Sequence, residues 1–138
     1  MLNHRTNIYF HWLDFDKAIE EIASRLDQKK LLDTFDMIYG VPRNGLVLAV
    51  ALSHAIEKPI TLTLSPYYKV VSRTLIIDDI SDSGKTLRSI GAAFKHQILT
   101  ATIHVVEDSL VIPTIWLFEK KKGDWIVYPW EKYPKEET

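Results

Sequence analysis

Apolar residues recur along the first part of the chain at the spacing of an amphipathic helix. Between residues 14 and 30 they form one stripe opposite a charged face: Phe15, Ala18, Ile19, Ile22, Ala23 and Leu26. This pattern predicts a helix that buries the stripe. A second helix is predicted over residues 46–56, where nearly every position is apolar, and a third over residues 85–96.

Short apolar runs lie between these helices and predict strands. The runs cover residues 36–41, 60–64, 74–77 and 101–106. Residues 115–118 are apolar again, and a charged turn follows over residues 119–124. Strands that alternate with helices are typical of a parallel sheet. The pattern therefore predicts an α/β fold.

The strand at residues 74–77 ends in the most informative segment of the chain. It stops at Asp78 and Asp79, and Asp82-Ser83-Gly84-Lys85-Thr86 then opens a helix. Ligands of open α/β sheets bind at the carboxyl ends of strands. Unpaired N–H groups at a helix start favour a phosphate, whereas carboxylates suit sugar hydroxyls or a hydrated magnesium ion. Together they predict a site for a sugar phosphate with a metal.

Two other interpretations of this segment are a solvated loop and a nucleotide-binding P-loop. The acids could be solvated loop residues, with Asp82 or Ser83 as a helix cap. A nucleoside-triphosphate P-loop is excluded, because that motif needs a glycine five residues before its Gly-Lys pair and Asp79 stands there.

Two further segments carry chemistry. The first is Pro42-Arg43-Asn44-Gly45, where an Asn-Gly pair tolerates unusual backbone angles and points N–H groups outward. With Arg43 it would form an anion pocket; the alternative is an ordinary turn with a solvated arginine. The second is residues 124–131, whose Trp125 and Trp130 could be hydrophobic anchors or a platform for a ligand.

Composition restricts the class of protein. The 138 residues fit one domain, and 46% hydrophobic and 25% charged residues are ordinary for a globular protein. A net charge of −1 gives no case for binding nucleic acid or an anionic membrane. The chain has no cysteine, its first ten residues lack an apolar signal core, and its longest apolar run, residues 46–52, is too short to span a bilayer. These features favour a cytoplasmic protein.

Residues 75–86 resemble the signature for phosphoribosyl pyrophosphate (PRPP) in the type I phosphoribosyltransferases. That signature is four apolar residues, two acids, an apolar residue, any residue, Asp, Ser or Thr, Gly, any residue, Thr, and every position is met. Residues 42–45 resemble the family's pyrophosphate turn, usually Ser/Pro-Arg-Gly-Gly. Residues 125–131 resemble the Trp-Ile-x-x-Pro-Trp-Asp/Glu element in the hood of the xanthine-guanine members.

The resemblance spans about residues 12–131 and implies the family's fold. That fold is a central, mainly parallel sheet flanked by helices, with a small C-terminal hood. It implies a single domain over residues 1–131, with the hood at about 107–131 and a frayed tail at 132–138. Dimers are common in the family, so a homodimer is compatible with it.

The resemblance also implies how PRPP would be bound. Asp78 and Asp79 would hold the ribose hydroxyls, and Asp79 would reach Mg²⁺ through water. The 5′-phosphate would be held by Ser83, Gly84, Lys85 and Thr86.

Three further groups complete the implied site. The pyrophosphate would be bound by Arg43, Asn44 and Gly45. Trp125 would stack on the base and the backbone of Ile126 would contact the base edge, with Glu131 a weaker candidate. Asp82 would be the general base that takes a proton from the purine.

Two departures from the family pattern bear on function. The family's purine-recognising lysine falls at Val106, with Lys120 as an alternative placement, so the identity of the base stays open. The family's long mobile lid is reduced to residues 65–73, where Lys69 and Arg73 could reach pyrophosphate or be surface charges.

The function that the resemblance implies is Mg²⁺-dependent transfer of the 5-phosphoribosyl group from PRPP to a purine-like base, with release of pyrophosphate. The main alternative is a non-catalytic PRPP- or nucleotide-binding regulator on the same fold. A receiver-like signalling domain is a weaker alternative.

Overall fold

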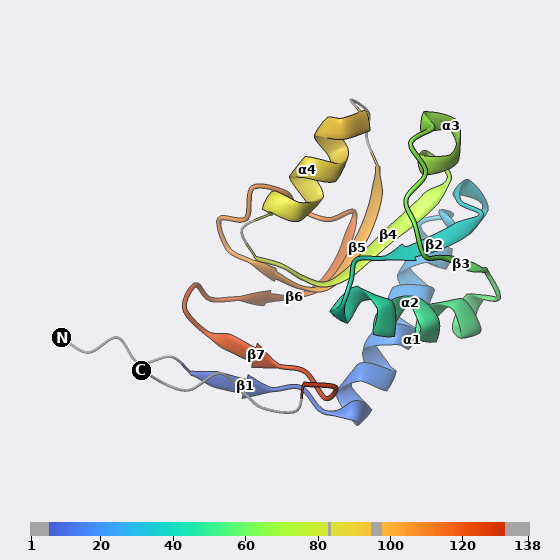
Figure 1. Ribbon diagram of the computed structural model, residues 1–138. Coiled ribbons are helices and arrows are strands. Elements are labelled where there is room, and N and C mark those ends of the chain that lie inside the picture. The colour runs from blue at the N-terminus through green and yellow to red at the C-terminus, as the bar shows by residue number, and fades with distance from the viewer. Residues whose placement is uncertain (1–5, 83, 95–97, 132–138) are drawn as a thin grey trace.

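A five-stranded parallel sheet forms the centre of the protein (Figure 1). The structure is a computed structural model that describes residues 6–82, 84–94 and 98–131. The strands across the sheet are β3 (Ile60–Thr61), β2 (Met37–Gly40), β4 (Thr74–Ser81), β5 (Leu99–Val106) and β6 (Ile115–Lys120). Every neighbouring pair is parallel. This arrangement confirms the predicted fold class.

Helices cover both faces of this sheet. The helices α1 (Trp12–Gln28) and α2 (Asn44–Ile56) pack on one face, and α4 (Lys85–Phe94) lies on the other (Figure 1). Two short helical segments, η1 (Leu32–Thr34) and α3 (Tyr68–Val71), lie in the connections. No described helix is long and apolar enough to cross a membrane.

The helix α1 forms where the apolar stripe predicted it. The side chain of Asp14 accepts a hydrogen bond from the backbone N–H of His11 at 2.8 Å and so caps its first turn. Its apolar stripe is buried, with Ile22 and Leu26 fully inaccessible to solvent. Burial of this face is the main source of the helix's stability, because helices in proteins are stabilised mostly by packing of their apolar face.

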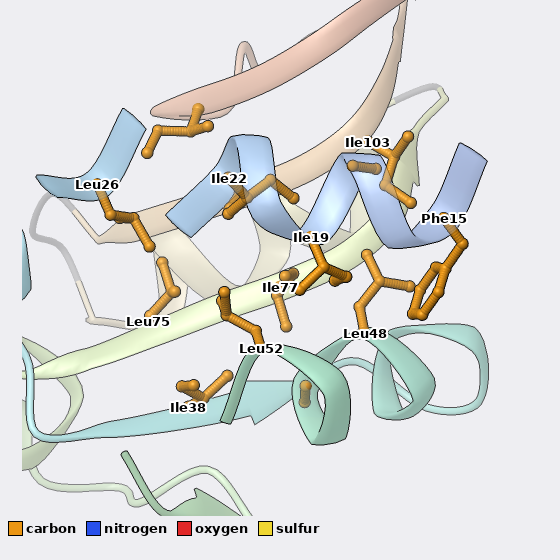
Figure 2. Close-up of a cluster of buried hydrophobic side chains, with 14 of the residues drawn as sticks. Phe15, Ile19, Ile22, Leu26, Ile38, Leu48, Leu52, Leu75, Ile77 and Ile103 are labelled. Atoms are coloured by element: carbon orange, nitrogen blue, oxygen red, sulfur yellow. The ribbon is translucent and has the colours of Figure 1, made fainter. Parts of the chain in front are cut away.

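The core lies between α1, α2 and the sheet (Figure 2). Ile22 and Leu26 from α1, Leu52 from α2, and Leu75 and Ile77 from β4 belong to one buried cluster. The next residue on the other face of β4, Ile76, packs with Val41 and Leu87 under α4. Because β4 is buried on both faces, its sequence is a continuous apolar run rather than an alternating one.

Some elements differ from the predictions at their ends. The strand β4 continues to Ser81, four residues past the predicted end, because Asp78 and Ile80 stay in register with β5. The edge strand β3 ends at Thr61, whose hydroxyl donates to the carbonyl of Thr63 and closes a turn. The helix α2 begins at Asn44, two residues early. The predicted end of the third helix at residue 96 lies outside the described residues, as do residues 132–138.

A small second sheet joins the two ends of the described chain. Here β1 (Asn7–Tyr9) pairs in parallel with β7 (Trp125–Val127). The strand β1 was not predicted, since three residues are too few to show a pattern. Within the range assigned to the hood, residues 107–131, β6 is the edge strand of the main sheet and β7 belongs to the small one.

A glycine lets α2 approach β4 closely. A Cβ added at Gly45 would lie 2.5 Å from the carbonyl oxygen of Ile77, so Gly45→Ala must push the helix away and should destabilise the fold by about 1–3 kcal/mol. Gly91 in α4 has no atom within 4 Å of an added Cβ, and Gly91→Ala should stabilise by about 0.5–1 kcal/mol. Thermal or urea unfolding of both variants measures the two changes. Shifts of the same sign would contradict this packing.

Candidate functional site

The predicted site residues gather at one edge of the main sheet. The strands are parallel, so their carboxyl ends share that edge, and the turns that lead into α2 and α4 start there. The hood segment that follows β6 covers the same edge. Chain direction alone therefore brings three distant segments of sequence together.

A cavity of about 220 Å³, the central cavity, lies at this edge of the sheet. Six residues predicted to form the site line it: Asn44, Asp79, Asp82, Trp125, Ile126 and Glu131. They come from all three segments singled out in the sequence. Their convergence on one cavity is what a shared ligand requires.

A smaller cavity of about 90 Å³, the phosphate cavity, adjoins it at the start of α4. Gly84, Lys85 and Thr86 line it together with Asp78, and Asp82 lines both cavities. The fourth residue predicted to bind the 5′-phosphate, Ser83, lies outside the described residues. The start of a ten-residue helix favours an anion here through its N–H groups and dipole.

Gly84 fixes the shape of the phosphate cavity. Its φ is +81°, a left-handed conformation that favours glycine, and an added Cβ would lie 2.6 Å from the backbone nitrogen of Val111. The turn therefore packs directly against the loop that leads into β6. Any side chain at this position would open that contact.

The carboxylate of Asp79 is held from two sides. Its Oδ2 accepts a hydrogen bond from Asn44 Nδ2 at 2.7 Å, and its Oδ1 accepts one from the backbone N–H of Ile80 at 2.8 Å. Asp78 Oδ1 accepts a third from the backbone N–H of Asp79, also at 2.8 Å. Asp79 is only 6% exposed, so these bonds replace much of its lost hydration.

The turn before α2 differs from its prediction. Asn44 is the first residue of a regular helix, so the unusual backbone angles expected of the Asn-Gly pair are absent there. The N–H of Gly45 donates to Val41 O at 2.8 Å instead of facing outward. Arg43 is exposed, follows a cis peptide bond, and lines neither cavity. Of this turn, the structure brings only Asn44 into the central cavity.

Burial and the nearby charge of Asp79 raise the pKa values of two acids at this edge of the sheet, Asp78 and Glu131. Burial, and then the charge of Asp79, raises the pKa of Asp78 to about 8. Burial and the charge of Asp79 also raise the pKa of Glu131. A proton therefore stays on Asp78 at neutral pH in the free protein, and a cation would be favourable beside this pair.

The acidic residues of the site, Asp78 and Asp79, fit a Mg²⁺ ion that keeps most of its water ligands. No cluster of three or more acidic, histidine or cysteine ligands occurs in the described part of the chain. Magnesium is usually held by one or two carboxylates together with water and substrate phosphates. Asp78 and Asp79 supply that number of carboxylates beside the phosphate cavity.

Trp125 and Trp130, at the end of the hood, lie in different surroundings. Trp125 is half-buried and lines the central cavity. Trp130 stacks on Tyr128, with centroids 5.0 Å apart and ring planes 3° from parallel, and meets the ring of Phe15 edge-on at 5.5 Å. The anchor interpretation therefore holds for Trp130, whereas Trp125 is open to a ligand.

Lys120, the alternative placement of the family's purine-recognising lysine, lies at the central cavity. It is the register partner of Val106 across β5 and β6, is 7% exposed, and lines the central cavity, whereas Val106 does not. Its Nζ donates to the carbonyl of Asp124. The signal that would have found it is strand register, which places the ends of β5 and β6 side by side.

The short lid segment is only partly available to the site. Arg73 forms an ion pair with Asp36, with Nε 2.6 Å from Oδ2. These residues directly precede β4 and β2, at the opposite edge of the sheet from the cavities. Arg73 is thus held away from the site, and Lys69 is an exposed cation of the segment 65–73.

Similarity to known proteins agrees with this geometry. A purine phosphoribosyltransferase from Pyrococcus horikoshii Ot3 is 31% identical; the match covers 96% of this chain and 99% of that chain, with a TM-score of 0.75. The xanthine-guanine phosphoribosyltransferase of Cereibacter sphaeroides is 22% identical over 151 residues, which cover 94% of this chain and 90% of the relative. No protein-family model matches the chain.

A third similarity is to a hypothetical protein from Neisseria gonorrhoeae with bound ppGpp. It is 17% identical, covers 94% of this chain and 92% of that chain, and has a TM-score of 0.72. At this identity the likeness shows the fold alone.

The match to the Pyrococcus protein shows the family. This chain belongs to the type I phosphoribosyltransferases, close to the purine phosphoribosyltransferases. The class is defined by transfer of a phosphoribosyl group from PRPP to a base.

The raised pKa of Asp78 predicts how stability depends on pH. An acid that holds its proton more tightly when folded stabilises the fold fully below pH 4 and loses that contribution as pH rises toward 8. Without Mg²⁺ or ligand, Asp78→Asn should therefore become more stable than the wild type as pH rises over this window. The gain is at most about 1.4 kcal/mol per pH unit, and denaturant unfolding at several pH values measures it.

The control for this prediction is Asp36→Asn. Hydrogen bonding to Arg73 lowers the pKa of Asp36, so removal of that carboxylate should reduce stability near neutral pH. A stability difference between Asp78→Asn and wild type that stays flat from pH 4 to 8 would contradict the raised pKa of Asp78.

Proposed function

We propose that this protein is a Mg²⁺-dependent purine phosphoribosyltransferase that transfers the 5-phosphoribosyl group of PRPP to a 6-oxopurine-like base and releases pyrophosphate. The observation that carries the proposal is the pair of adjoining cavities that share Asp82. One lies at a helix start suited to phosphate and the other lies beneath an aromatic wall. A nucleoside 5′-monophosphate has these two ends.

The sugar phosphate is bound where the two cavities meet. The 5′-phosphate accepts hydrogen bonds from the start of α4 at residues 84–86, and the ribose hydroxyls lie against Asp78 and Asp79. Support for this placement comes from Asp79, whose carboxylate is fixed by Asn44 beside the central cavity. A ligand that arrives there finds its partners already in position.

The residues beside the phosphate cavity fit a magnesium ion held by Asp79 through water. When bound, Mg²⁺ supplies positive charge that favours departure of pyrophosphate. A cation beside this pair would also favour the ionised form of Asp78, whose pKa is raised in the free protein by burial and then by the charge of Asp79.

The reaction forms one bond and breaks another at the anomeric carbon. A nitrogen of the base attacks that carbon, and the bond to the pyrophosphate oxygen breaks with its electron pair leaving on pyrophosphate. The base nitrogen loses a proton, which Asp82 accepts. Asp82 suits this role because it is exposed and lines both cavities, and so lies between sugar and base.

Recognition of the base falls to the hood and to β6. Trp125 offers a face for stacking, and the buried Lys120 can donate hydrogen bonds to a 6-oxo group. The ammonium group of a lysine has three hydrogen-bond donors. One donor of Lys120 is used on the carbonyl of Asp124, which leaves the others for a ligand. Lys120 thereby supplies, from the adjacent strand, the donor that Val106 lacks.

A non-catalytic nucleotide-binding regulator is the second candidate. The short segment at residues 65–73 favours it, because little chain is available to close over PRPP and exclude water. The fold-level likeness to a hypothetical protein with bound ppGpp is compatible with it. Turnover separates the two candidates, since a regulator binds PRPP or nucleotide without consuming a base.

The first test measures pyrophosphate release and nucleotide formation from PRPP and Mg²⁺. The bases are guanine, xanthine, hypoxanthine and adenine. We expect turnover with a 6-oxopurine, and a fall in kcat of about 10²- to 10⁴-fold for Asp82→Asn, since a positioned general base is lost. Asp16→Asn, at an exposed position on α1, is the matched control and should keep wild-type kcat. Binding of PRPP without consumption of any base would favour the regulator.

A second test concerns the choice of base. Lys120→Met removes a charged hydrogen-bond donor, so kcat/KM for a 6-oxopurine should fall about 10- to 100-fold while adenine gains or stays unchanged. Lys122→Met, two residues away and exposed, is the control and should leave both values as in the wild type. An equal loss for oxo and amino bases would remove Lys120 from base recognition.

A further inference from the structure

A buried hydroxyl links the hood to the acidic strand. Tyr128 Oη donates to the backbone carbonyl of Asp79 at 3.2 Å and also lies 2.8 Å from Nδ1 of His104. Tyr128, His104 and Asp79 are 2%, 5% and 6% exposed, so water does not compete for these bonds. The proposed reaction assigns no role to Tyr128 or His104.

The number of protons fixes the direction of each bond. A tyrosine hydroxyl has one hydrogen, which is used on the carbonyl of Asp79, so His104 Nδ1–H must donate to the hydroxyl oxygen. Burial, and then the charge of Lys120, lowers the pKa of His104 to about 4, which leaves a neutral ring with a single N–H. Burial and the neighbouring acids raise the pKa of Tyr128, so its hydroxyl remains a donor.

The segment that receives this bond is held by side chains in addition to its pairing with β5. The N–H groups of Asp79 and Ile80 are both bonded to carboxylate oxygens. The carbonyl of Asp79 is bonded to Tyr128. The backbone that carries the ribose-binding acid is therefore held partly by the hood.

The ring of Tyr128 is itself held firmly. It stacks on Trp130 at 5.0 Å and meets Phe10 and His104 edge-on at 5.8 and 5.6 Å. Its carbonyl accepts the N–H of Glu131 at 3.0 Å, which turns the hood back over the cavity. A clamped ring keeps its hydroxyl at a defined place relative to Trp125 and Ile126, three and two residues earlier in the hood.

We propose that Tyr128, oriented by His104, is a positioning residue that fixes the base-binding wall of the central cavity relative to the ribose-binding acids. The catalytic part of this inference rests on the proposed function. Tyr128 lines the same cavity as Asp79 and Trp125, so its hydroxyl lies between the sugar-binding and the base-binding halves of the site. Displacement of reacting groups by about 1 Å can cost 10²-fold in rate.

The test compares ligands that occupy one half of the site with a ligand that occupies both. Ribose 5-phosphate fills the sugar half, and guanosine 5′-monophosphate spans sugar and base. In Tyr128→Phe, calorimetry should show affinity for the nucleotide reduced about 10-fold, affinity for ribose 5-phosphate within about 2-fold of wild type, and kcat reduced about 10- to 100-fold at little-changed KM for PRPP. The control Tyr9→Phe, at a tyrosine 54% exposed in β1, should change none of these values.

A pair of variants at His104 separates positioning from simple stability. His104→Asn retains a nitrogen donor at the distance of Nδ1 from the backbone and should keep wild-type nucleotide affinity. His104→Leu lacks the donor and should behave like Tyr128→Phe. Melting temperatures of all variants show whether the losses follow stability instead.

The outcomes decide the two claims separately. Nucleotide affinity that is unchanged in Tyr128→Phe, equal behaviour of the two His104 variants, losses that follow melting temperature alone, or a wild type that does not bind the nucleotide would each overturn the positioning role. A wild type that binds the nucleotide but turns over no base overturns the proposed transfer reaction. The nucleotide affinities still decide the positioning role in that case.

Discussion

Burial of two adjacent carboxylates at the end of the central strand is the constraint on which the rest of the site depends. Charged groups removed from water must be neutralised or given partners. Here Asp78 keeps its proton to about pH 8, and Asp79 receives the amide of Asn44 and the N–H of Ile80. The turn before α2 is thereby tied to β4. Stability is given up at neutral pH to keep two carboxylates together at this edge of the sheet.

The same constraint explains how the hood is attached. The hydroxyl of Tyr128 reaches the carbonyl of Asp79, and Lys120 at the end of β6 places a cation close to His104 and the central cavity. Trp130 fastens this segment to α1 through Phe15. The hood is thus joined by polar contacts at the site and by aromatic contacts away from it. Arg73 is bound at the far edge of the sheet, and most of the residues that line the central cavity come from the hood.

Sequence patterns predicted the parts of this structure that local physics determines. The stripe of α1, the buried strand before Asp78, and the turn at residues 84–86 that opens α4 each depend on residues close in the chain. The extension of β4 to Ser81 was missed, because two acids suggest a loop unless the register with β5 is known.

The residues whose position sequence patterns did not determine depend on contacts between distant segments. Lys120, an alternative placement in the sequence analysis, reaches the central cavity because β6 lies beside β5, and Tyr128 reaches it because the hood folds over Asp79. The strand β1 forms because β7 is there to pair with it. The prediction for Asn44 rested on its backbone angles, whereas in the structure its side-chain amide makes the contact with Asp79. Register and tertiary pairing carry this information, and composition and periodicity do not.

The central claim is that one site at the carboxyl edge of the sheet holds a nucleotide from phosphate to base. A crystal structure with bound guanosine 5′-monophosphate tests it most directly. The account predicts the phosphate at residues 84–86, the ribose hydroxyls at Asp78 and Asp79, and the purine on Trp125 with its 6-oxo group facing Lys120. A nucleotide bound instead in the larger cavity of about 530 Å³ beside β1 and Phe118 would contradict it.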